Sequence, residues 1–151
     1  MNNKTTLHVL LVLTFIYAGL SCFAYLLTSA MLPSMQQFYE ANRSMFPEQV
    51  HTMMTTMLDI PRGYFLAAGL LYGVELFGAV LMWNLRPSGF HSYTLARLLL
   101  LLVPLLFLGR GFLGLGDVMM AALFILVYWM LMKQLGAFSS APEEEKGESE
   151  S

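Results

Sequence analysis

Long apolar runs alternate with short polar stretches along this chain, and four such runs cover most of it. A helix needs about 20 consecutive apolar residues to cross a bilayer core of about 30 Å. Three runs meet that length, and the third reaches the lower limit. The pattern predicts an all-α membrane protein, a four-helix transmembrane bundle with spans at about residues 7–32, 63–85, 93–109 and 113–135.

The third apolar run is the shortest of the four and also contains a charge and a proline. From Tyr93 to Gly109 it has 17 residues, among them Arg97 and Pro104. A re-entrant or tilted segment is therefore an alternative to a short span. Because Arg97 lies near one end of the run, its side chain can extend toward water, which favours a true span.

Composition agrees with a membrane solvent, since 57% of the residues are hydrophobic and 12% are charged. Soluble domains average about 45 to 50% apolar and about 25% charged residues. We expect one transmembrane domain at 1–137 and a disordered acidic tail at 138–151. The net charge of −2 comes mainly from this tail, which argues against nucleic acid as a partner and leaves the lipid bilayer as the expected surroundings.

Basic residues predict the orientation, because Lys and Arg near helix ends are retained on the cytoplasmic side. With the N-terminus inside, five basic residues lie on the cytoplasmic side and three lie outside. We therefore expect both termini in the cytoplasm. The five are Lys4, Arg86, Arg97, Lys133 and Lys146, and the three are Arg43, Arg62 and Arg110.

The outer segment 34–60, between the first two spans, predicts two short helices. Pro33 is expected to end the first span, and Ser34 with Gln37 has the spacing of a capping box. The second helix is expected to begin near Pro47 and to be amphipathic, lying in the interface or capping the bundle. Its apolar residues recur at three- and four-residue spacing: Val50, Met53, Met54, Met57 and Leu58.

Soft side chains in this second helix raise the possibility of a Cu(I) site. Imidazole and thioether groups suit Cu(I), and His51, Met54 and Met57 supply them, together with Met53. On a helix Met53 points away from the others, and methionine is a common filler of irregular apolar surfaces. We therefore expect no metal and no cofactor, with Cu(I) kept as an alternative.

Local chemistry predicts the remaining boundaries. Pro87 opens a Pro-Ser-Gly sequence that is typical of a tight inner turn, and Asp117 is expected to cap the fourth span. Tyr93 and Tyr128 lie near predicted helix ends, where amphipathic rings favour the headgroup region. Residues 109–114 match the GxGxxG pattern of dinucleotide sites, but without a strand before them they predict only a glycine-rich turn.

Glu75 is the only acidic residue in the middle of an apolar run, and it lies near the expected bilayer midplane. A charge there costs about 2.5 to 3.5 kcal/mol, so Glu75 should face the bundle interior, a cavity or a partner. Arg97 is the best partner by depth, and Tyr72, on nearly the same helix face, is a possible hydrogen-bond donor to the carboxyl group. Glu75 serves either as interhelical glue or as a functional group.

Small residues give the second span two surfaces for close packing. Gly69 and Gly73 form a GxxxG pair that favours either self-association or packing within the chain, and Gly78 lies on the face of Glu75. Since no catalytic motif is present, we expect no enzyme. The leading hypothesis is a small multi-pass membrane protein that associates with itself or with another membrane protein. The alternatives are a proton- or cation-coupled transporter or channel subunit using Glu75, and a Cu(I)-binding protein.

Overall fold

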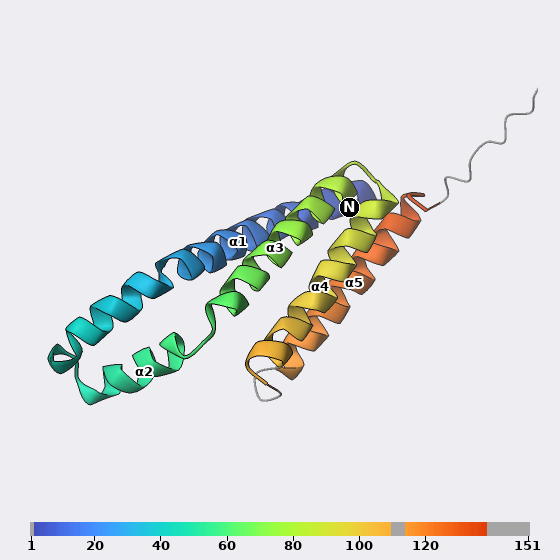
Figure 1. The fold of residues 1–151 in the computed structure, drawn as a ribbon. Helices are drawn as coiled ribbons and strands as arrows, with labels where there is room; N and C mark the ends of the chain where they lie inside the picture. Colours follow the sequence, from blue (N-terminus) through green and yellow to red (C-terminus); the bar gives the residue numbers. More distant parts are fainter. Residues whose placement is uncertain (1, 110–113, 139–151) are drawn as a thin grey trace, which may run out of the picture.

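The computed structural model describes residues 2–109 and 114–138, and helices account for nearly all of them (Figure 1). Four helices in this part of the chain are long and apolar enough to cross a membrane, which confirms the predicted all-α four-helix arrangement. In chain order the elements are α1 (Asn3–Ala41), η1 (Arg43–Met45), α2 (Glu48–Leu58), α3 (Arg62–Trp83), α4 (Pro87–Phe107) and α5 (Leu115–Gln134).

Helix α3 is the central helix, because it packs against α1 on one side and α4 on the other. The α3–α4 contact includes Gly78, which lies so close to α4 that an added Cβ would be 2.7 Å from the backbone nitrogen of Tyr93. It continues to the other end of α3, where Gly63 lies against Phe107. By contrast, α5 touches α1 sparingly. Helices α1, α3 and α4 therefore form the tightly packed part of the bundle.

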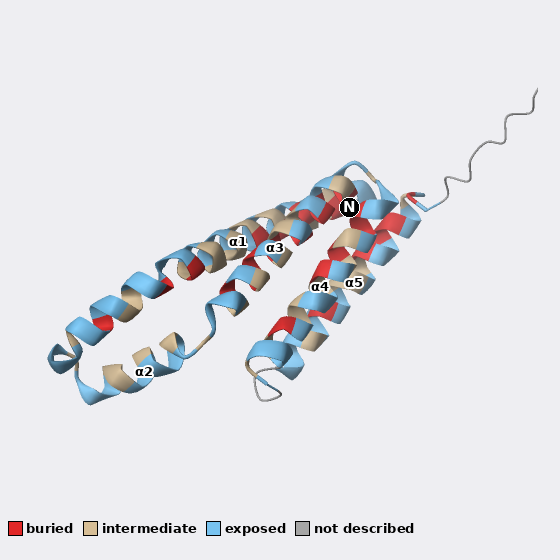
Figure 2. Cartoon of the chain, in the orientation of Figure 1, coloured by how far each residue is buried: buried red, intermediate tan, exposed pale blue. Residues whose placement is uncertain are grey.

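A cluster of buried apolar side chains lies at one end of the bundle, where the N-terminal part of α1 meets the α3–α4 connection and the end of α5 (Figure 2). It includes Leu7, Leu11, Met82, Tyr93, Tyr128 and Met132. The connection itself is short. Asn84 is the C-cap of α3, Leu85 adopts a positive φ of 56°, and Pro87 begins α4, where its missing N–H costs nothing.

The prediction that Pro33 ends the first helix is wrong, because α1 continues through Pro33 to Ala41 as one helix of 39 residues. The capping box at Ser34 and Gln37 is therefore not used. Proline removes one backbone hydrogen bond, but the residues on both sides remain helical. At 1.5 Å per residue α1 is about 58 Å long, nearly twice the bilayer core.

Helix α2 forms as predicted, but only part of its apolar stripe is covered. Val50, Met54 and Leu58 are half-buried, whereas Met53 and Met57 are exposed. The helix is tied to the far end of α1 by a hydrogen bond from Gln36 Nε2 to the Leu58 carbonyl. Within the described residues it therefore pairs with the extension of α1 and does not cap the bundle.

The third span is longer than expected because Pro87 begins the helix, where a turn was predicted. Helix α4 has 21 residues and is continuous through Arg97 and Pro104. Tyr93 thus lies nearly two turns inside the helix and is fully buried, as is Tyr128 in α5. The prediction that these two tyrosines mark the membrane interface is wrong.

Helix α5 begins at Leu115, and Gly114 is its N-cap. Asp117 lies in the first turn, so the prediction that Asp117 caps the helix is also wrong. A carboxylate in the first turn still complements the positive end of the helix dipole. Residues 110–113 of the glycine-rich turn, and residues 139–151 of the predicted tail, lie outside the described residues.

Candidate functional site

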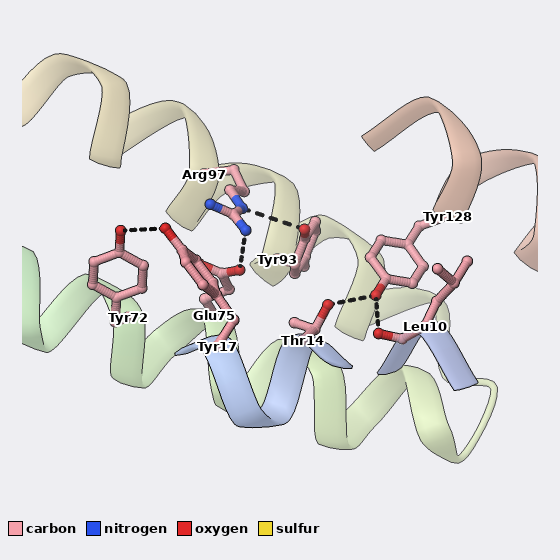
Figure 3. A network of polar contacts seen from close by, with 8 residues as sticks. All are labelled: Leu10, Thr14, Tyr17, Tyr72, Glu75, Tyr93, Arg97 and Tyr128. Carbon is pink, nitrogen blue, oxygen red and sulfur yellow. Dashed lines mark hydrogen bonds and ion pairs between the residues drawn. The ribbon is translucent and has the colours of Figure 1, made fainter. Parts of the chain in front are cut away.

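Glu75 and Arg97 form an ion pair between α3 and α4, with Arg97 Nη2 2.9 Å from Glu75 Oε1 (Figure 3). The two residues lie at similar distances before and after the connection at 84–86, so the antiparallel helices place them at the same depth. The pairing expected from the sequence is confirmed. The Glu75 side chain is fully buried, whereas 15% of the Arg97 side chain is exposed.

The carboxyl group of Glu75 has fewer partners than a buried carboxylate usually has. Neither oxygen makes a hydrogen bond of good geometry with the described residues. The contact from Arg97 to Oε1 has the distance of a hydrogen bond without a favourable angle, so it is an ion pair. Oε2 has no hydrogen-bond partner in the part of the chain that the structure describes, although buried polar atoms in proteins are normally satisfied.

Arg97 is the point where all four long helices meet. Its guanidinium carbon lies 5.4 Å from the ring centre of Tyr17 on α1, 5.7 Å from that of Tyr93 on α4 and 6.0 Å from that of Phe124 on α5. The Nε–H group also donates to the Tyr93 hydroxyl at 3.3 Å. Aromatic faces attract a cation, so these rings help to hold the guanidinium inside the bundle.

Tyr72 does not make the hydrogen bond to Glu75 that the sequence suggested. Its hydroxyl lies 3.3 Å from that of Tyr17 (Figure 3). Its ring stacks on that of Tyr25, with the ring centres 5.5 Å apart. The prediction that Tyr72 donates a hydrogen bond to the carboxyl group is therefore wrong. Tyr72 and Glu75 lie on nearly the same face of α3, but packing against α1 decides where the long Tyr72 side chain points.

A second polar contact, between α1 and α5, was not predicted from the sequence. The hydroxyls of Thr14 and Tyr128 lie 2.6 Å apart, and Tyr128 donates to the Leu10 carbonyl at 2.9 Å (Figure 3). Both side chains are buried. The sequence did contain a signal for this contact, because Thr14 is a polar residue between apolar neighbours within the first apolar run.

A cavity of about 690 Å³ lies between the four long helices, with Arg97 in its wall. Four tyrosines from α1 and α3 line one side, namely Tyr17, Tyr25, Tyr64 and Tyr72. Leucines, Met120 and Ala121 from α4 and α5 form much of the other side, together with Asp117 in the first turn of α5. Glu75 lies behind Arg97 and does not line this cavity. The cavity therefore reaches the ion pair from the side of the cation.

The three candidate packing glycines of the second span, Gly69, Gly73 and Gly78, take part in packing within the chain. A Cβ on Gly69 would lie 2.8 Å from the Leu26 side chain of α1, and a Cβ on Gly73 would lie 3.8 Å from Cys22 Sγ. Gly78 approaches the α4 backbone. Of the two interpretations of the GxxxG pair, packing inside one chain is the one that these contacts support.

The three candidate copper ligands lie on α2, away from the ion pair. His51 Nδ1 is 2.6 Å from the Tyr39 hydroxyl, which leaves Nε2 as its available ligand atom. Met54 is half-buried and Met57 is exposed. Among the described residues no group of three His, Cys, Asp or Glu side chains is placed to hold a metal ion. The Cu(I) alternative would have to rest on the methionines.

Comparison with known proteins leaves the site to be interpreted from its own geometry. No protein-family model matches the chain, and neither a curated protein sequence nor a solved structure is similar to it.

Proposed function

We propose that this small multi-pass membrane protein is a subunit of a proton- or cation-coupled carrier or channel, in which Glu75 binds the coupling ion. The observation that carries the proposal is the buried Glu75–Arg97 ion pair beside a cavity that enters the bundle. Intramembrane acids are rare because they are costly to insert, and they commonly mark ion pathways. Arg97 is then the partner that Glu75 exchanges for the coupling ion.

The unequal exposure of the two partners supports an exchange of this kind. A group that enters the cavity meets Arg97, which is partly exposed, before it meets the fully buried Glu75. An anion that pairs with Arg97 leaves the Glu75 carboxylate without its counter-charge. A buried carboxylate in an apolar site is costly, so it then takes up a proton or a metal cation.

Association with other chains is part of the proposal, because four helices are few for a complete transport pathway. The GxxxG pair Gly69 and Gly73 packs against α1 of the same chain, so the proposal does not use this pair for association. Association is expected through the outward apolar surfaces of the bundle, where many large side chains are exposed. Crosslinking in native membranes tests this part separately.

The experiment that tests the proposal measures flux in proteoliposomes containing the purified full chain and a pH-sensitive dye. Proton entry is followed after a pH jump, with and without opposing gradients of Na⁺ or K⁺. Wild-type protein is expected to raise the rate above that of empty vesicles, and Glu75→Gln is expected to abolish the increase. Glu48→Gln, at an exposed position on α2, is the matched control and is expected to behave as wild type.

Two results contradict the proposal. One is wild-type flux no greater than that of empty vesicles under any of these gradients. The other is an unchanged rate for Glu75→Gln in a preparation that elutes as a folded protein with the size of the wild type. In either case the remaining role is association without chemistry of its own.

A further inference from the structure

The cavity holds hydrogen-bond donors that the protein itself leaves unused. A guanidinium has five N–H donors, and the contacts of Arg97 with polar atoms of the described residues engage only Nε and Nη2. Donors in an apolar site are costly when they lack an acceptor. A carboxylate or phosphate group is the natural complement, because its oxygens accept charge-assisted hydrogen bonds from the guanidinium fork.

Two tyrosine hydroxyls near Arg97 also offer hydrogen-bond donors to an anionic ligand. Tyr17 and Tyr72 line the same cavity and share one hydrogen bond at 3.3 Å, in which only one of them donates. The other hydroxyl hydrogen is free for a ligand. Tyr17 also lies against the guanidinium of Arg97. The cation and the hydroxyls therefore form a polar end suited to an anionic head group.

The rest of the cavity is suited to an apolar body. Beyond Arg97, its walls on the side of α4 and α5 are mostly apolar and include Phe124, and Asp117 is the only carboxylate among the described lining residues. The volume of about 690 Å³ falls within the range of about 300 to 1,000 Å³ that holds small ligands. This size fits one alkyl chain with its head group. The wall side chains are Leu13, Leu100, Leu101, Leu108, Met120 and Ala121.

The cavity opens toward the surface that faces lipid. Leu13 and Tyr17 on α1 are 57% and 51% exposed, and Met120 on α5 is 54% exposed, although all three line the cavity. Helices α1 and α5 make few contacts, and their buried hydrogen bonds lie at Thr14 and Tyr128. The exposed lining side chains therefore place the opening of the cavity on the side of α1 and α5.

From these contacts we infer that the cavity binds a single-chain amphiphile with an anionic head group, which enters from the bilayer between α1 and α5. The head group pairs with Arg97 and the alkyl chain lies along the leucines of α4. Asp117, at the other end of the cavity, repels the anion and so favours the Arg97 end. This inference names the substrate class for the proposed function and rests on it, since the head group displaces Glu75 from Arg97.

Binding is tested with the purified full chain in detergent micelles and radiolabelled oleate as the probe. Saturable binding is expected, at least about tenfold tighter than for oleyl alcohol or oleylamine, because only the carboxylate accepts charge-assisted hydrogen bonds from the Arg97 guanidinium. Acetate and inorganic phosphate, which lack an alkyl chain, are expected to bind too weakly to compete. Equal binding of oleate and oleyl alcohol overturns the inference, and so does tighter binding of oleylamine.

A matched pair of variants locates the site. Ala121 lines the cavity and is buried, so Ala121→Phe is expected to fill the cavity and reduce oleate affinity at least about tenfold. Ala122 is the next residue and is exposed, so Ala122→Phe is the control and should bind as wild type. Arg97→Gln is expected to weaken binding and Arg97→Lys to restore part of it. Equal affinity of wild type and a folded Ala121→Phe places the ligand elsewhere and refutes the inference.

The two proposals fail in different ways. Oleate binding that Ala121→Phe removes, in a protein without flux, supports the ligand site and contradicts transport. Flux that depends on Glu75, in a protein that does not bind oleate, supports the coupling role and overturns the amphiphile.

Discussion

Breaking the Glu75–Arg97 pair from either side is expected to destabilise the bundle, and the two single variants should not be equivalent. At 2.9 Å the attraction between unit charges is about 6 kcal/mol for an effective dielectric constant of about 20. The cost of removing both charges from water offsets much of it. Loss of one partner nevertheless leaves a buried charge unpaired, which costs about 3 to 5 kcal/mol.

The variants are Glu75→Gln, Arg97→Gln and the double variant. Glu75→Gln should be the more destabilising single change, because an unpaired arginine keeps its charge at any accessible pH. An unpaired carboxylate can take up a proton and become neutral, which limits the cost of Arg97→Gln. The double variant places two neutral amides in contact and should be more stable than the sum of the single effects predicts.

The measurement is the free energy of unfolding, from titration of the protein in mild detergent micelles with sodium dodecyl sulfate. The four proteins form a double-mutant cycle, and we expect a coupling energy of at least about 1.5 kcal/mol, as found for close charge pairs. A coupling below about 0.5 kcal/mol would mean that the two side chains act independently. That outcome would refute the reasoning, whatever the size of the single effects.

Three further predictions concern packing, hydrogen bonding and orientation. Substitution by alanine should be most destabilising at Gly78, where the added Cβ would meet the α4 backbone. It should cost less at Gly69, where the Cβ meets a flexible side chain, and least at Gly73. Unfolding titrations that give another order of stabilities contradict these contacts. Tyr128→Phe removes two buried hydrogen bonds and is expected to cost about 0.6 to 2 kcal/mol by the same titration, so an unchanged midpoint argues against them. In intact cells, Glu48→Cys in a cysteine-free background should react with an impermeant maleimide from outside, and labelling only after lysis would reverse the predicted orientation.

The ion pair was predictable from the sequence because depth can be counted along a helix. A charge within an apolar run has a definite distance from the run's end, and Glu75 and Arg97 have compatible distances on neighbouring spans. The partner of Tyr72 was not predictable in this way. Its direction depends on Tyr17 and Tyr25, which approach from another helix.

Helix boundaries were the other source of error, and proline explains two of them. Pro33 was expected to end a helix and lies inside one, while Pro87 was expected in a turn and begins a helix. A proline is compatible with the first turn of a helix and, at a cost, with its interior, so the residue alone does not choose between these places. The shift of the α4 boundary then moved Tyr93 from the interface into the core.

The short connection between α3 and α4 has a consequence for how the chain enters the membrane. Only three residues, 84–86, separate the two helices, so they can insert together as a hairpin. Each charge inserted alone costs about 2.5 to 3.5 kcal/mol, but Glu75 and Arg97 lie opposite each other in this hairpin and can enter as a neutral pair. Both residues precede α5 in the chain. The charges can therefore be neutralised during synthesis, before the last helix has been made.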